Sequence, residues 1–245
     1  MFVLLPPSET KAPGGRGPAL DLRTLAFPQL APLREQLMTA LVTVSADPVA
    51  ARTALSVAAS KDADIAANAG LRTAPTMPAV FRYTGVLYEA LDVASLPPAA
   101  LARADERLLI SSALFGVLAG GDAVPAYRLS AGSKLPGLVR LPAFWRPHLV
   151  DVLAGLPGPV VDLRSGAYAS FAAVPGAITV RVVTENPAGA RVVVSHFNKA
   201  TKGLFARALV TSRADISDIA GVVRVARRAG LRVERTAERG LEIVS

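Results

Sequence analysis

The stretch Arg191-Val-Val-Val-Ser-His-Phe-Asn-Lys-Ala-Thr-Lys-Gly-Leu-Phe-Ala-Arg-Ala-Leu-Val210 joins the pattern of a strand to that of a helix. Its β-branched first part is typical of a buried strand, expected over residues 191–195. Asn198 belongs to the residue types that cap helices, so we predict a helix from Lys199 onward. A strand and a helix in direct succession favour an α/β protein.

The predicted helix has two different faces. At 100° per residue, one face holds the apolar side chains Leu204, Phe205, Ala208 and Leu209. The other face is cationic and small at its centre, with Lys199, Gly203, Ala206, Arg207 and Arg213. Such a face suits a phosphate-bearing ligand, because the free N–H groups of a helix N-terminus attract anions. A solvated amphipathic helix explains the same residues equally well.

Composition limits the classes of function. With 51% hydrophobic residues, a chain of 245 residues can bury a substantial core. Its 27 Lys and Arg against 19 Asp and Glu give a net charge of +8, which favours a polyanionic partner, a phosphate-rich small molecule or simply good solubility. The absence of cysteine excludes disulfides, thiolate metal sites and a cysteine nucleophile, and two histidines make a multi-histidine zinc centre improbable.

Nothing in the sequence indicates export or membrane insertion. The N-terminal run Met1-Phe-Val-Leu-Leu lacks basic residues and ends at Pro6, unlike a signal peptide. No segment reaches the roughly 18 uninterrupted apolar residues of a spanning helix. We therefore expect a soluble cytoplasmic protein with no membrane partner.

Strands and helices alternate along the chain. Strands are expected over residues 2–5, 79–85, from 108, and over 159–163, 178–183, 231–235 and 241–244; helices are expected over 29–44, from 48 towards 61, and over 65–71, 101–107 and 216–229, with others near 88–91 and ending at 153. Prolines and glycines predict a mobile loop over 12–18 and an irregular connector over 72–78. No repeat or boundary divides the chain, so we predict one compact domain over residues 1–245, with a mixed sheet and surrounding helices.

Polar residues follow several of the predicted strands. Ser8 and Lys11 come after the first strand, and Arg164, Ser165 and Tyr168 come after the strand over 159–163. In open α/β sheets, ligands bind outside the carboxyl ends of the strands. A plain polar loop accounts for the first of these stretches as well. Ser111 and Ser112 end another strand, where capping of the next turn is the simpler explanation.

Two further features suit nucleic acid. Tyr127 and Arg128 could stack on a base and contact a phosphate, although a Tyr beside an Arg is also common on ordinary surfaces. Lys134-Leu-Pro-Gly-Leu138 is similar to the turn of a helix-hairpin-helix DNA-binding element. Trp145, by contrast, is expected in the core.

Seven segments together extend along nearly the whole chain: Leu4-Leu-Pro-Pro-Ser-Glu-Thr-Lys11, Phe81-Arg-Tyr-Thr-Gly-Val-Leu-Tyr88, Ser111-Ser-Ala-Leu-Phe-Gly-Val-Leu118, Pro125-Ala-Tyr-Arg-Leu129, Phe144-Trp145, Asp162-Leu-Arg-Ser-Gly-Ala-Tyr168 and Ser195-His-Phe-Asn-Lys-Ala-Thr-Lys-Gly-Leu204. In this order, they resemble the YaaA-type peroxide stress protein family. The resemblance implies a cytoplasmic bacterial protein that supports tolerance of hydrogen peroxide and helps keep unincorporated iron low. It also implies a single α/β body with a positively charged cleft, a helix-hairpin-helix-like element and DNA binding.

By the same resemblance, the cleft would be lined by Ser8, Lys11, Tyr127, Arg128, Arg164, Ser165, Tyr168, His196, Lys199 and Lys202. This sequence departs from the family pattern in three places. Ala-Gly-Gly follows Leu118 in place of an Arg-Pro step, the region around Leu135 is rearranged, and Ser-His-Phe replaces Ser-Phe-Tyr before the lysine motif. The first two departures weaken the case for a DNA-binding hairpin, and the third places a titratable side chain where an aromatic one is expected.

Two functions follow as hypotheses. The first is binding of double-stranded or structured DNA through phosphate contacts of Lys199, Lys202, Arg207 and Arg128. The second is an enzyme that acts on a nucleotide, a phosphorylated metabolite or damaged nucleic acid, in which His196 could act as a base and Lys11 or Lys199 could bind an oxyanion. We expect no cofactor and no metal, because carboxylates are not clustered and the histidines are far apart in sequence.

Overall fold

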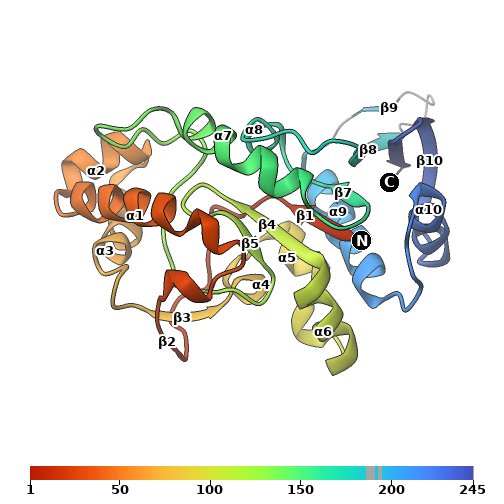
Figure 1. The fold of residues 1–245 in the computed structure, drawn as a ribbon, viewed down its shortest axis with the longest axis horizontal. Coiled ribbons are helices and arrows are strands. Elements are labelled where there is room, and N and C mark those ends of the chain that lie inside the picture. The colour runs from red at the N-terminus through yellow and green to blue at the C-terminus, as the bar shows by residue number, and fades with distance from the viewer. Residues whose placement is uncertain (186–190, 193–194, 245) are drawn as a thin grey trace.

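The computed structural model describes residues 1–185, 191–192 and 195–244, without the side chains of Ser195 and His196. Within these residues the protein is a mixed α/β structure in which helices surround a mainly parallel sheet (Figure 1). Helices α1 to α3 gather at one end of the molecule, and α10 lies with the β10–β11 hairpin at the other. The fold class expected from the sequence is confirmed at this level.

The strands form two sheets. The larger has the order β10-β11-β8-β7-β1-β4-β5, with β9 paired to β8, and the smaller has the order β2-β3-β6. The bounds are β1 (Phe2–Leu5), β2 (Gly17–Ala19), β3 (Pro75–Pro78), β4 (Leu108–Ser112), β5 (Gly116–Ala119), β6 (Ala123–Val124), β7 (Val160–Asp162), β8 (Ile178–Glu185), β9 (Arg191–Val192), β10 (Arg232–Ala237) and β11 (Gly240–Val244).

The helices connect and cover these strands. Their bounds are α1 (Ala31–Ser45), α2 (Pro48–Leu55), α3 (Asp62–Ala69), α4 (Ala79–Arg82), α5 (Val86–Leu91), α6 (Pro98–Arg107), α7 (Leu141–Ala154), α8 (Gly166–Ala169), α9 (Ser195–Thr211) and α10 (Ile219–Arg228). Short 3-10 turns cover Leu22–Thr24, Pro28–Leu30, Ala59–Lys61 and Val93–Ser95. No helix of the described residues is both long enough and apolar enough to cross a membrane.

Strand β1 lies at the centre of the large sheet. It pairs in parallel with β4 on one side and with β7 on the other, and Val3, Leu4 and Leu5 are fully buried. A short run of consecutive apolar residues is what a strand covered on both faces requires. Because the chain passes from β1 to β4 and later returns to β7, β1 stands where the strand order reverses, which is the usual ligand position in such sheets.

Most of the expected elements are found, but the strand predicted over 79–85 is wrong. Its first residues form the short helix α4, and Arg82 is fully buried. The guanidinium of Arg82 donates to the carbonyls of Val124, Gly14 and Pro75, and also to that of Ala12. A buried cation with this many backbone acceptors fixes the conformation of the chain around it. Local sequence patterns do not predict the burial of this arginine.

The same arginine explains two further corrections. The loop over 12–18, expected to be mobile, is held by Arg82 and continues into β2. The connector over 72–78 contains β3, which pairs with both β2 and β6. Its prolines lie at the two ends of the strand, so Thr76 and Met77 between them keep their N–H donors.

Part of the stretch over residues 191–210 also folds differently from the prediction. Helix α9 begins at Ser195, so Asn198 lies inside the helix and does not cap it. β9 pairs antiparallel with β8, and Val192 is 46% exposed, not buried as the strand pattern predicts. Residues 193 and 194 of the predicted strand lie outside the described residues.

The helix-hairpin-helix element is not confirmed. No helix lies between Val124 and Leu141, so the turn at residues 134–138 has a helix on its C-terminal side alone. Trp145 is buried as expected: its Nε1 donates to the Ala113 carbonyl at 2.9 Å, and its ring lies against Gly116. Gly116 has φ of 74°, and a Cβ there would lie 2.8 Å from the ring, so only glycine fits.

Candidate functional site

A cavity of about 870 Å³ opens beyond the carboxyl ends of β1 and β7. Residues 6–10, which follow β1, and residues 164–168, which follow β7, line it together with 84–88, 130–132, Asn198, Lys199 and Lys202. We call this cavity the strand-exit pocket. Its position agrees with the rule that parallel sheets bind ligands where their strands end.

The pocket brings together six of the residues predicted from the sequence. They are Ser8, Arg164, Ser165, Tyr168, Lys199 and Lys202. Lys11, Tyr127 and Arg128 lie behind or beside its wall, and Arg207 lies elsewhere on α9. The side chain of His196 is outside the described part of the chain, so its predicted role as a base stays a prediction.

The amine of Lys11 is enclosed by aromatic rings. Its Nζ lies 4.2 Å from the ring centre of Tyr127 and 5.3 Å from that of Tyr83, and it donates to the Ser8 carbonyl at 3.1 Å. Burial lowers the pKa of Lys11 to about 7; Glu9 opposes this shift and Arg128 adds to it. A neutral amine is therefore well populated near neutral pH.

The ring of Tyr127 lies against the amine of Lys11 and is itself held by buried hydrogen bonds. Its hydroxyl shares hydrogen bonds of 2.7 Å with Tyr83 and with Ser112, and only 4% of the residue is exposed. Burial raises the pKa of Tyr127 well above its usual value, so the hydroxyl stays protonated. The buried ring has no open face for a base, and Ser112 accepts from the Phe115 N–H, as the capping explanation predicts.

Arg128 is already surrounded by carboxylates. Its guanidinium lies 3.3 Å from Glu9 and 4.0 Å from Asp64 and also donates to the Glu9 carbonyl. The side chain of Asn68 bonds both the N–H and the carbonyl of Arg128, which fixes its backbone. These contacts neutralise much of the charge that the sequence analysis assigned to phosphate binding.

Arg164 is likewise paired. Its Nε and Nη2 bond the two carboxylate oxygens of Asp162 at 3.0 and 2.7 Å, and it also donates to the carbonyls of Tyr168 and Ala172. Only 2% of the side chain is exposed. This arginine therefore shapes the wall of the pocket and carries a compensated charge.

Lys199 and Lys202 are the cations of the pocket that form no ion pair with a described residue. Lys199 is exposed, whereas Lys202 is half-buried and donates to the Leu163 carbonyl at 3.0 Å. Burial lowers the pKa of Lys202, and the nearby charge of Asp162 opposes that shift. Both lysines lie in the second turn of α9, next to the first turn, whose free N–H groups also favour anions.

The small centre of the α9 face does not form a ligand site. A Cβ on Gly203 would lie 2.2 Å from the Leu87 carbonyl oxygen, because α5 packs directly against α9 there. Arg207 donates to the carbonyls of Leu91 and Asp92 at the end of α5 and to the hydroxyl of Ser95. The prediction that small residues leave room for a ligand is corrected: they let two helices approach closely.

The sequence indicated the hydroxyls that follow β1 but not the hydroxyl of Thr84, which also lines the pocket. Thr10 shares a hydrogen bond of 3.1 Å with Ser8 and accepts another of 3.1 Å from Thr84. Ser8 and Thr10 both follow β1, where the sequence places two hydroxyls. Thr84 could not be placed while its segment was taken for a strand.

The described residues hold no group of three His, Asp or Glu side chains that could bind a metal ion. Glu9 is the acidic side chain that lines the pocket, and it is paired with Arg128. The balance of charge is positive through Lys199 and Lys202, but the paired arginines leave the broad basic cleft expected from the sequence unconfirmed.

Comparisons with known proteins extend over nearly the whole chain. The model of a family described as peroxide stress protein YaaA matches residues 1–236. A UPF0246 protein of Corynebacterium efficiens is 49% identical over 238 residues, covering 96% of this chain and 95% of its own length. A UPF0246 protein of Streptomyces coelicolor is 44% identical over 242 residues, covering 97% and 93%.

Proposed function

Because this chain belongs to the peroxide stress protein YaaA family, we propose that it acts in the bacterial cytoplasm by binding DNA during peroxide stress. One observation carries the proposal: Lys199 and Lys202 lie together in the strand-exit pocket, at the N-terminal end of α9, with no ion pair to a described residue. Unpaired cations beside a helix N-terminus attract phosphate.

The pocket can receive a phosphate and part of a nucleotide. Lys199, which is exposed, meets the ligand first, and the half-buried Lys202 holds the phosphate that enters. The hydroxyls of Ser8, Thr10 and Thr84 can turn to donate to the same oxygens. The aromatic residues among those that line the pocket, Tyr88 and Tyr168, are buried, so base stacking inside the pocket is limited and with it sequence readout there.

Salt dependence of DNA binding tests this proposal. Replacing Lys199→Ala and Lys202→Ala together should weaken binding to all sequences alike. The slope of log affinity against log salt should fall by about 1.8, since each phosphate contact contributes about 0.9.

A matched control keeps the same loss of charge. Lys61→Ala with Lys134→Ala removes two exposed lysines outside the pocket and should leave most of the affinity. Equal losses in both double variants, or binding that does not change with salt, would count against the pocket as the DNA site.

The effect on free iron belongs to the same proposal at the level of the cell. A protein that covers DNA and a lower level of unincorporated iron both reduce oxidative damage to DNA. The described residues offer no metal-binding cluster, so we assign no iron site among them.

A second candidate function is catalysis on a nucleotide, a phosphorylated metabolite or damaged nucleic acid. The observation that favours it is Lys11, whose pKa near 7 suits a proton acceptor and whose amine lies against the Ser8 carbonyl beside the pocket. Turnover of such substrates should be lost in Lys11→Met while their binding persists. Turnover that survives this change would exclude Lys11 as the base.

A further inference from the structure

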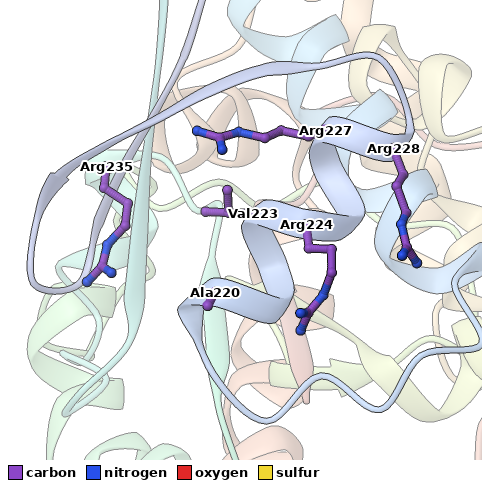
Figure 2. A pocket seen from close by; sticks show the side chains of 6 residues that line it. All are labelled: Ala220, Val223, Arg224, Arg227, Arg228 and Arg235. Atoms are coloured by element: carbon purple, nitrogen blue, oxygen red, sulfur yellow. The ribbon is translucent and has the colours of Figure 1, made fainter.

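A second hollow, of about 670 Å³, lies between α10 and β10 (Figure 2). Ala220 and Val223 form its apolar floor, and Arg224, Arg227, Arg228 and Arg235 surround it. We call it the arginine hollow. It shares no lining residue with the strand-exit pocket.

The local sequence explains why arginines gather here. Helix α10 is capped by Asp218, which accepts from the Gly221 N–H at 2.7 Å. It buries Val222, Val225 and Ala226, and leaves 8% of Val223 exposed to the hollow. Its remaining face therefore carries arginines at 224, 227 and 228. Alternation along β10 places Val233 and Arg235 on one side and Arg232 and Glu234 on the other.

The arginines of the hollow lack acidic partners. Arg227 donates to the Val233 carbonyl and Arg235 to the Glu238 carbonyl, both of which are neutral acceptors. Arg224 and Arg228 form no hydrogen bond or ion pair with a described residue, and no carboxylate lines the hollow.

The other side of the same hairpin is built differently. There Arg191 bonds Glu234 and Glu242, and Arg232 lies 3.1 Å from Glu185. Like charges four residues apart on a helix, as at 224 and 228, oppose folding slightly. An anion from outside would supply the partner that this side lacks.

The floor narrows the choice of anion. Figure 2 shows Arg224 and Arg235 on opposite sides of Val223, so a ligand between them would contact both guanidinium groups and an apolar surface. Guanidinium forks match carboxylates in pairs of parallel hydrogen bonds. A nucleic-acid strand would make its apolar contact chiefly through its bases, and no aromatic side chain lines the hollow to stack on them.

We propose that the arginine hollow binds an acidic peptide segment of a partner protein, with one apolar side chain on Val223 and flanking Asp or Glu carboxylates on the arginines. The site is open and shallow, and peptide segments bind such surfaces through a few anchors. Electrostatic attraction would speed the encounter and make it sensitive to salt.

A labelled peptide of sequence Asp-Glu-Leu-Asp-Glu-Leu-Asp-Glu tests the proposal by fluorescence anisotropy with the full chain. Arg224→Ala with Arg228→Ala should weaken binding by at least about tenfold, a change of about 1.4 kcal/mol. Arg16→Ala with Arg140→Ala removes two exposed arginines outside the hollow and should leave binding unchanged. Both Arg pairs are exposed, and matching circular dichroism spectra would confirm that the variants fold.

Two competitors distinguish the occupants. The same peptide with Ser in place of Leu should bind more weakly, because the floor is then unfilled. A single-stranded oligonucleotide of thymidines should compete poorly. Equal binding of the Ser peptide, stronger binding of the oligonucleotide, or the same loss in both double variants would overturn the proposal.

Discussion

The surroundings of Lys11 change the pH at which its amine loses a proton. Two tyrosine rings and a backbone carbonyl surround its Nζ, and burial brings the pKa to about 7. The unfolded chain keeps the ordinary value near 10.4. Between these two pH values the unfolded state binds more protons than the folded state. This lysine therefore makes the stability of the fold rise with pH, and it lowers that stability most below pH 7, where the buried amine must be charged.

The substitution Lys11→Met should therefore help most at low pH. The stability gained by the variant over the wild type, measured as the difference in free energy of unfolding, should be larger at pH 6 than at pH 10. The two gains should differ by a few kcal/mol, since one pKa unit corresponds to about 1.4 kcal/mol. Urea unfolding at the two pH values measures this. Lys11→Arg stays charged at both pH values, so its loss of stability relative to the wild type should be largest at pH 10. If the free energies of unfolding of the variants and the wild type changed with pH in the same way, the burial of this amine would be contradicted.

Arg164 is another residue that the folded chain uses for its own structure. Replacing Arg164→Met leaves Asp162, whose side chain is 13% exposed, without its partner, and should lower the free energy of unfolding by about 3–5 kcal/mol. Chemical denaturation is the measurement. Lys199→Met, an exposed change in the same pocket, should stay within about 0.5 kcal/mol of the wild type.

At the level of elements, the contact of α5 with α9 shapes the strand-exit pocket. Residues of both helices line the pocket, and Gly203 allows their backbones to touch. Arg207 then binds the end of α5 through two carbonyls. The position of Lys199 and Lys202 therefore depends on a contact one turn further along the same helix.

Gly203→Ala tests this contact. Alanine favours an isolated helix over glycine by about 1 kcal/mol, yet the added methyl group would lie 2.2 Å from the Leu87 oxygen. We expect a net loss of up to about 2 kcal/mol, since overpacking costs about 1–3 kcal/mol and the helix preference of alanine offsets about 1 kcal/mol of it. Gly166→Ala in α8, where no atom lies within 4 Å, should be neutral or stabilising in thermal unfolding.

At the level of the whole molecule, the net charge of +8 is not spread evenly over binding surfaces. Arg34 and Arg82 are fully buried, and Arg128 and Arg164 are paired with carboxylates. Cations without an acidic partner among the described residues gather in two places, the strand-exit pocket and the arginine hollow.

Peroxide survival checks this division in the cell. In a strain that lacks this protein, the wild-type chain should restore growth in hydrogen peroxide and lower chelatable iron. The Lys199→Ala, Lys202→Ala variant should restore neither at equal protein levels, whereas the Lys61→Ala, Lys134→Ala control should restore both. Full rescue by the pocket variant would separate the stress function from the pocket.

The sequence by itself determined the α/β class, the buried strand β1, the amphipathic helices and the polar strand exits, because periodicity and residue type act locally. Packing determined the rest. Buried Arg82 ordered a loop rich in glycine and made α4 from an expected strand, and the closeness of α5 turned the small face of α9 into a helix contact. A cation that finds a carbonyl or carboxylate partner within the fold is no longer available to a ligand. Many of these partners are distant in sequence, so only the tertiary structure brings the groups together.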